Sequence, residues 1–183
     1  MAEPAARLGR EDWVGAALEA LAEGGVEAVR VEVLARRLKV TKGSFYWHFQ
    51  DRPALLAALR EHWEAVATGA VIRKVEEGGG DAPTRLWRLM ELTLPADGRV
   101  DMAMRAWAAV DAAAAEAVQR VDRTRIAYLE GLFAGMGLDA ATVRARSRLA
   151  YFSLIGEFAV GVRAPVADRL AAGRLNHAML VRP

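Results

Sequence analysis

The sequence predicts an all-α protein with about nine helices. Apolar residues make up 54% of its 183 residues, Ala is abundant and β-branched residues do not form long runs, which together favour packed helices. Apolar side chains recur at the spacing of three or four residues that places them on one side of a helix. Asp, Gly or Pro also marks the boundaries of these periodic segments, and such residues begin or end helices.

The first predicted helix covers residues 10–23. Trp13, Ala17 and Leu21 repeat at intervals of four residues and therefore lie on one side of it. Two consecutive glycines follow and end the helix, because glycine readily leaves the helical conformation at a C-terminus. We expect this helix to pack behind the two short helices that come next.

Two short helices joined by a tight turn follow, over residues 34–49 (LARRLKVTKGSFYWHF). The first buries Leu34, and the second, which begins at Thr41, buries Phe45 and Phe49 on one side. The Thr41 hydroxyl can cap the second helix by accepting a hydrogen bond from a backbone N–H in its first turn. The segment is a candidate helix-turn-helix.

The other side of the second short helix has an unusual composition for a solvent-exposed helix, which normally carries Glu, Lys and Arg. A helix that lies in a DNA major groove needs small residues where the backbone approaches, hydroxyls and Lys for polar contacts, and aromatic rings for apolar contacts. This mixture favours a DNA-reading role over a solvated surface. The residues on this side are Lys42, Gly43, Ser44, Tyr46, Trp47 and His48.

Positive charge is concentrated around the same segment. The net charge of the chain is only +2, which is too small to indicate nucleic-acid binding by itself. Between positions 36 and 52, however, five basic residues stand against a single acid, Asp51. A local basic patch at the reading helix is what phosphate binding requires.

The run TKGSFYWHF, with LARRL before it and DRPALL after it, resembles the helix-turn-helix of the tetracycline-repressor-type (TetR) family of bacterial transcriptional regulators. The similarity extends from about residue 12 to about residue 59. It implies a DNA-binding domain over residues 1–50 and a helical ligand-sensing and dimerisation domain over residues 51–183. The DNA contacts that it implies are Arg30, Thr41, Lys42, Gly43, Ser44, Tyr46, Trp47, His48 and Arg52.

Two positions depart from the common pattern of that family. Arg30 stands where Thr or Ser often caps the second helix, so the side-chain cap is lost, although Arg30 can still reach a phosphate. Lys39 stands where the turn often has Gly. A residue other than glycine at positive φ costs about 1 kcal/mol, so we expect a slightly strained turn.

Six further helices are predicted after the helix-turn-helix, each with a marker at its start. The first of them begins at Asp51 and Arg52, runs as a long lever that joins the DNA-reading part to the rest, and ends at three glycines, 78–80. The other five begin after Asp81 and Pro83, after Asp97-Gly98, at Asp111, at Asp139 and after Pro165; the fourth of these ends at about Val162 and the last is short.

Aromatic and methionine side chains recur in the central helices. Ordinary core packing is the simpler interpretation of each one. The family resemblance nevertheless implies a cavity here whose occupation by a small molecule releases DNA, and Trp or Tyr would give a mainly apolar pocket a few polar anchors. The candidate ligand-binding residues are Trp63, Trp87, Met90, Met102, Met104, Trp107 and Tyr128.

The last two helices are candidates for a dimer interface. A wide apolar face interrupted by Gly156 suits close contact between helices, although burial within one chain would produce the same pattern. The resemblance implies that these helices pair across a two-fold axis. The candidate interface residues are Leu149, Phe152, Ile155, Gly156, Phe158, Ala159, Val166 and Leu170.

The composition argues against several other classes. There is no Cys, and the three His residues lack partners at metal-ligand spacing. No nucleophile-elbow serine and no phosphate-binding glycine loop occur, so we expect no enzyme, cofactor or metal. No run reaches the roughly 18 apolar residues of a membrane helix, and the first residues do not resemble a signal peptide, so we expect a cytoplasmic protein without a membrane partner.

The resemblance therefore implies a ligand-responsive one-component transcriptional regulator, a repressor, that binds double-stranded operator DNA as a homodimer through residues 41–49. The operator would be near-palindromic and the effector a small apolar or aromatic molecule. Two alternatives keep the same fold: an activator, or a helix-turn-helix that contacts protein. A helical enzyme is a further rival, but the apolar central positions offer it no acid–base pair.

Overall fold

The computed structural model describes residues 8–161 and 164–182, and within these ranges every regular element is helical. The predicted fold class is confirmed: counting one uninterrupted helix from Arg52 to Glu77 once, the described residues form nine α-helices. The chain divides into two compact units, one of residues up to 63 with 99–117, the other of residues 64–98 with those from 118 onwards. The predicted functional division at residue 50 stays a prediction.

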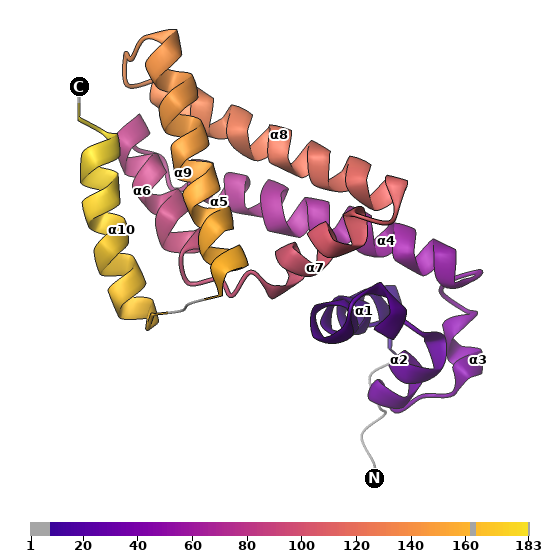
Figure 1. Ribbon diagram of the computed structural model, residues 1–183. Coiled ribbons are helices and arrows are strands. Elements are labelled where there is room, and N and C mark those ends of the chain that lie inside the picture. The colour runs from indigo at the N-terminus through magenta and orange to yellow at the C-terminus, as the bar shows by residue number, and fades with distance from the viewer. Residues whose placement is uncertain (1–7, 162–163, 183) are drawn as a thin grey trace. The chain divides into compact units, whose positions relative to one another are not determined.

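The first unit is organised around α1, whose buried side carries Trp13, Ala17 and Leu21, as the apolar stripe predicts. Helix α7 packs along α1 and contributes the buried Met104 and Trp107. Figure 1 shows the first three helices together at the indigo and violet end of the chain. The elements of this unit are α1 (Arg10–Gly24), a 3-10 turn (Val26–Ala28), α2 (Val31–Arg37), α3 (Lys42–Phe45), α4 (Arg52–Glu64), α7 (Arg99–Ala108) and the start of α8 (Ala112–Ala134).

The reading helix is shorter than the sequence predicts. We expected a helix over residues 41–49, whereas the α-helical part, α3, ends at Phe45. Beyond it the backbone continues in tight turns, in which the amide of His48 donates to the carbonyl of Phe45 at 2.9 Å. A segment this short gains little from helix propagation, so the burial of Phe45 and Phe49 decides its path.

The long helix that begins at Arg52 contains a six-residue π-helical segment, Ala65–Ala70, between α4 and α5 (Val71–Glu77). The wider turns of a π-helix disturb the backbone hydrogen bonds, and a side chain from α8 compensates. Arg125 donates from Nε to the hydroxyl of buried Thr68 at 3.1 Å and from Nη2 to the carbonyl of Ala67 at 3.2 Å. The predicted long helix is therefore present, with a local distortion that its sequence pattern does not reveal.

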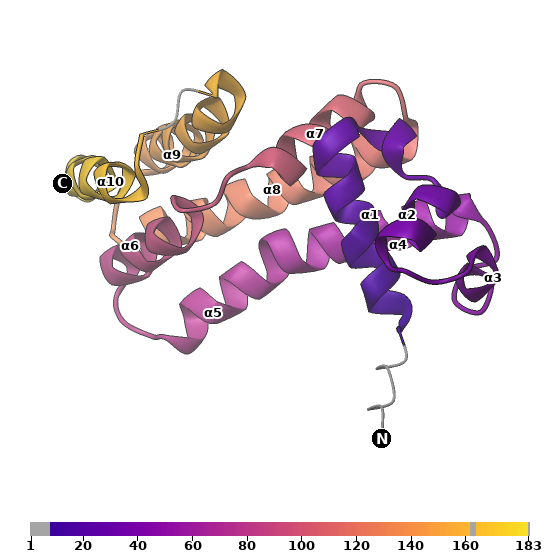
Figure 2. The same ribbon diagram turned by 90° about the horizontal axis from the view of Figure 1, so that it is seen from below.

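The second unit is a packed group of helices around α6 (Ala82–Thr93), the later part of α8, α9 (Ala140–Val160) and α10 (Val166–Leu180). Figures 1 and 2 both show α10 beside α6 and α9. The predicted last helix is not short but spans 15 residues, and the predicted end near Val162 lies outside the described residues. The core of this unit is formed by Leu86, Leu129, Leu132, Phe133, Val143, Tyr151 and Leu180.

Aspartate side chains begin four of the helices at the predicted positions. Asp51 and Asp111 each accept a hydrogen bond at 2.8 Å from the amide three residues later. Asp81 accepts from the amide of Thr84 at 2.9 Å, and Asp139 accepts from the amides of the second and third residues after it. These bonds satisfy amides that have no partner inside the helix, which explains why each helix begins where it does.

Candidate nucleic-acid interface

The short helix α3 is held by two aromatic side chains that point into the first unit. Phe45 is fully buried and meets Trp13 of α1 edge to face, with ring centroids 5.2 Å apart. Phe49 stacks on Phe45 with a centroid distance of 5.5 Å. Both were predicted to be core residues, and this anchoring makes the opposite side of α3 a fixed surface.

That opposite side is open to solvent. Trp47 is 87% exposed and Tyr46 is 57% exposed, values that ordinary packing does not explain for such large rings. Thr41, Lys42 and Gly43 are also exposed, while Ser44 and His48 are half-exposed. The structure therefore brings the predicted contacts of this segment together on one accessible surface, which we call the α3 surface.

Gly43 is not required by the internal packing of α3. A Cβ atom added there would meet Thr41 Oγ1 at 3.7 Å, which is an ordinary contact distance. Thr41 itself occupies the N-cap position with extended backbone, but its side chain makes no cap hydrogen bond, so the predicted hydroxyl cap is wrong. The Thr41 hydroxyl is thereby left on the exposed side of the turn.

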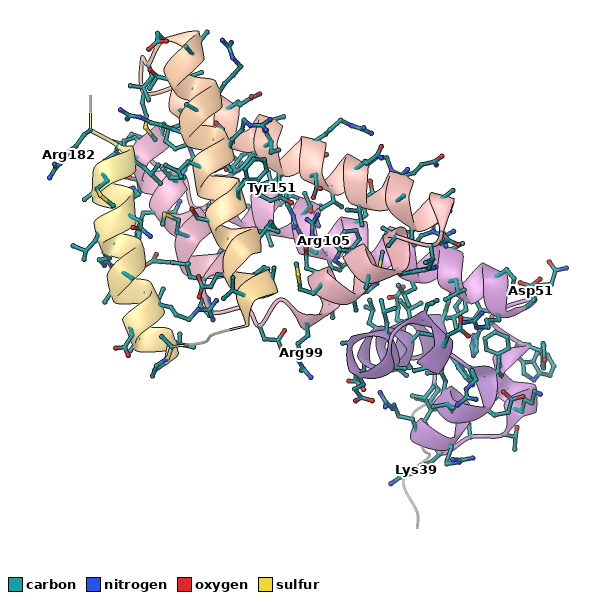
Figure 3. All side chains as sticks on the ribbon, in the orientation of Figure 1. Lys39, Asp51, Arg99, Arg105, Tyr151 and Arg182 are labelled. Carbon is teal, nitrogen blue, oxygen red and sulfur yellow. The ribbon has the colours of Figure 1, made fainter. Side chains whose placement is uncertain are left out.

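The turn before α3 has the strained conformation that the sequence predicts. Lys39 has φ of 56°, the one positive value among the non-glycine residues that the structure describes. Its side chain is exposed and projects outward from the turn (Figure 3). Arg30 occupies the N-cap of α2 without a side-chain cap bond, also as predicted, and is exposed as well.

Arg52 makes contacts that its predicted phosphate role did not include. Its Nε donates to the carbonyl of Val29 and its Nη2 to the carbonyl of Val26, both at 2.6 Å. The side chain is half-buried and ties the start of α4 to the turn that precedes α2. Arg52 therefore supports the geometry of the interface, and its contact with DNA stays a prediction.

Lys42 is paired within the unit. Its ammonium group donates to the carboxylate of Glu32 in the first turn of α2, and both side chains are more than half exposed. The hydrogen bond from Lys42 is the main reason that the pKa of Glu32 lies below its usual value, and the same bond raises the pKa of Lys42. Sequence patterns did not reveal this pair, because its members lie ten residues apart across a turn and not at helical spacing.

The predicted ligand-binding residues fall into both units, and their role stays a prediction. In the first unit Trp63, Met104 and Trp107 are buried, and the guanidinium of Arg60 lies over the Trp107 ring at 5.2 Å. Met102 is half-buried.

In the second unit the hydroxyl of Tyr128 donates a hydrogen bond to Glu76 at 2.5 Å. Burial of the side chain is the larger cause, and this hydrogen bond the smaller cause, of the raised pKa of Tyr128. Trp87 lies beneath the guanidinium of Arg174 at 4.1 Å, and Met90 packs against the core. These contacts are those of ordinary packing, which was the simpler interpretation of each residue.

Helices α9 and α10 each expose large apolar side chains, of which Phe152 is partly covered by the guanidinium of Arg148, 4.9 Å from the centre of its ring. The exposed residues are the predicted Leu149, Phe152 and Val166, and also Val160, Leu175 and Met179, which the sequence pattern did not indicate. We call these six residues the α9–α10 face. Among the predicted residues, Gly156 is half-buried and Ala159 is exposed on the same helix.

Three of the predicted interface residues are engaged inside their own unit. Phe158 is buried, and its ring lies so close to Gly98 that a Cβ added there would come within 2.3 Å of Phe158 Cγ. Ile155 packs against the core, and Leu170 is half-buried. Burial within one chain, the alternative considered for this pattern, thus accounts for Phe158.

Other kinds of site find no support in the part of the chain that the structure describes. Within residues 8–161 and 164–182, no group of three or more His, Asp or Glu side chains is placed to hold a metal ion. Within the same ranges, no helix combines the length and the apolar character needed to cross a membrane.

The family model for bacterial regulatory proteins of the tetR family matches residues 14–59. The tetracycline repressor protein class G of Vibrio anguillarum is 44% identical over 55 residues, which cover 30% of this chain and 26% of that protein. The match thus spans about a quarter of the length of this curated relative.

Solved structures resemble almost the whole chain. A transcriptional regulator from Rhodococcus sp. Rha1 has a TM-score of 0.75 and 21% identity, with 95% of this chain and 96% of that chain covered. The regulator FadR from Bacillus subtilis, in complex with stearoyl-CoA, has a TM-score of 0.68 and 18% identity, with 93% and 97% covered. At these identities the likeness concerns the fold.

Proposed function

Because this chain belongs to the tetR family of bacterial regulatory proteins, we propose that it is a one-component transcriptional regulator that binds operator DNA as a homodimer. The α3 surface is the observation that carries this proposal. It presents two exposed aromatic rings, a lysine, a glycine and hydroxyl groups on a rigid support. This combination of groups matches what DNA presents in its major groove and backbone, namely base edges, thymine methyl groups and phosphates.

Gly43 adds a steric argument. Its neighbours inside the protein leave room for a Cβ atom, so folding does not explain the absence of a side chain. Close approach of the α3 backbone to a partner does explain it. We infer that this backbone lies against the floor of the major groove, with Lys42 and Ser44 at base edges and Tyr46 and His48 at phosphates.

The homodimer is proposed from the α9–α10 face. Large exposed apolar side chains mark contact sites, and between Leu149 and Val160 the one charged residue, Glu157, is already bonded to Arg169. A single short reading helix contacts few base pairs. Two copies related by a two-fold axis would read two half-sites about 34 Å apart, which predicts a near-palindromic operator.

We further propose that the regulator is a repressor which a small apolar or aromatic effector releases from DNA. The buried and half-buried Trp, Met and Tyr residues of the central helices support this class of effector. The structural neighbour FadR was solved with stearoyl-CoA, whose acyl chain is also apolar. Effector binding would shift α4 and thereby change the spacing of the two reading heads; differential affinity of a few kcal/mol is sufficient.

The proposal is tested by selecting bound fragments from random or genomic DNA with the purified protein at two salt concentrations. We expect one near-palindromic sequence to be enriched. The affinity of the protein for this sequence should fall as the salt concentration rises, because protein contacts to phosphates release counterions from the DNA. Lys42→Ala should weaken operator binding on the order of tenfold per reading head. Lys74→Ala, which removes the same charge from an exposed site on α5, should have little effect.

Gly43→Ala gives a second, steric test. The variant should fold as stably as the wild type or better, because Ala favours a helix, yet it should bind the operator more weakly. Enrichment of no fragment at low salt, or equal operator binding by wild type and both α3 variants, would contradict the proposed function. The protein-contact interpretation of the helix-turn-helix would then be preferred.

A further inference from the structure

Glu32 is an acidic residue within the basic surroundings of the reading helix. It lies in the first turn of α2, is exposed, and places its carboxylate on the ammonium group of Lys42 at the start of α3. The proposed function gives Lys42 a role at the DNA but gives none to Glu32. A carboxylate in this position repels phosphates and at the same time neutralises a cation that would attract them.

The charges near α3 show how much this pair matters. Arg37 is bonded to Glu19 and Glu23 of α1, and Arg52 is bonded to backbone carbonyls. Within the described residues, Arg30, Arg36 and Lys39 are exposed and take part in no ion pair. Lys42 is therefore the one cation on α3 itself, and its charge is offset inside the protein.

An exposed ion pair is weak and easily exchanged for a better partner. DNA of any sequence presents phosphates to which Lys42 could bind. These phosphates are screened by counterions, and binding to them would bring the Glu32 carboxylate close to other negative charges. An operator offers a well-placed acceptor on a base edge, such as guanine O6 or N7, in addition to the phosphates. The exchange of Glu32 for DNA is thus favoured more strongly at the operator than elsewhere.

Building on the proposed function, we propose that Glu32 is an internal competitor of DNA for Lys42 and thereby limits the DNA affinity of the reading head. It retains Lys42 in the free protein and in complexes with non-specific DNA, and it yields Lys42 only to an operator. Glu32 thereby lowers the affinity for DNA without contributing a contact of its own, because the pair must be broken before Lys42 can bind a base edge or a phosphate.

The salt dependence of Glu32→Gln binding tests this inference. In wild type Lys42 already contacts DNA at the operator, so the variant should leave the salt slope for operator DNA unchanged. For a scrambled duplex, Glu32→Gln should free Lys42 for a phosphate and steepen the slope of log K against log[salt] by about 0.9 per reading head. Non-specific affinity at low salt should rise by roughly three- to tenfold per head, and operator affinity should rise by at least the same factor, because the variant has no pair to break on binding.

A double-variant cycle shows whether Glu32 acts through Lys42. In a Lys42→Gln background, Glu32→Gln should change non-specific affinity much less than in wild type, because the bonded cation is gone and only the screened repulsion of phosphates and the weaker charge interaction with Arg30 remain. Glu61→Gln is the matched control: it removes the same charge from an exposed position on α4 and should leave both salt slopes unchanged.

Two results would overturn the inference while the proposed function stands. One is an effect of Glu32→Gln that is equally large in the Lys42→Gln background. The other is a loss of operator affinity in Glu32→Gln confined to one base pair, which would make Glu32 a direct reader, for example of a cytosine amino group. Failure of wild type to bind any DNA would instead refute the proposed function and the inference together.

Discussion

The α3 surface and the α9–α10 face both expose large apolar side chains, but the polar groups around those side chains differ. Tyr46 and Trp47 are surrounded by Lys42, hydroxyl groups and an open backbone at Gly43. On α9, the exposed apolar side chains have few charged neighbours: Arg148 lies over the Phe152 ring at 4.9 Å, and Glu157 is the one charged residue between Leu149 and Val160. Exposed apolar area thus indicates a contact surface, while its polar surroundings indicate whether nucleic acid or a second copy of the chain fits it.

The largest expected effects separate the two sides of the helix-turn-helix. Trp13→Ala removes a fully buried ring that supports Phe45 and should lower the free energy of unfolding by about 3–5 kcal/mol. Trp47→Ala removes an exposed ring and should change the free energy of unfolding by less than about 0.5 kcal/mol. Urea unfolding measures both, and comparable losses for the two variants would mean that the α3 surface is part of the core.

The α9–α10 face is tested by placing a charge in it. Phe152 is 49% exposed, and Phe152→Glu would replace its ring, which Arg148 contacts, by a charged group in both copies of the proposed dimer contact. We expect the dimer dissociation constant, measured by analytical ultracentrifugation, to rise about a hundredfold or more. Val110→Glu, a control at a position that is 82% exposed, should leave association unchanged; equal behaviour of the two variants would exclude this face as the interface.

Arg52 distinguishes support of the α3 surface from contact with DNA. Arg52→Lys keeps the positive charge but cannot hold the carbonyls of Val26 and Val29 in the same fork, so stability should fall by about 1–3 kcal/mol. The measurement is thermal unfolding, with operator affinity determined well below the transition. Unchanged stability together with weakened DNA binding would show that Arg52 serves the phosphate alone.

The smallest expected effect concerns the turn. Lys39→Gly relieves the positive φ of 56° but increases the conformational freedom of the unfolded chain, so we expect a net gain in stability of about 0.5 kcal/mol. DNA affinity should decrease slightly with the loss of one exposed charge. A loss of stability would show that the lysine side chain contributes more to folding than the backbone conformation costs.

Local patterns in the sequence were sufficient to predict the helices, most of their boundaries and the buried side of the reading helix. Asp51, Asp81, Asp111 and Asp139 begin helices where expected because a cap acts on amides two or three residues away. Phe45 and Phe49 are buried because four-residue spacing places them on one side of a helical segment. The strain at Lys39 was predicted from the family resemblance, because members of that family often have Gly at this position of the turn.

Only the tertiary structure decided which side chains meet across the chain. The Lys42–Glu32 pair, the bonds from Arg52 and the separation of buried Phe158 from exposed Phe152 depend on distances between residues that no short-range spacing links. The same holds for the contact of Arg125 with the π-helical segment. Sequence periodicity assigns a residue to one side of a helix, whereas its partner on another helix is set by the packing of the whole unit.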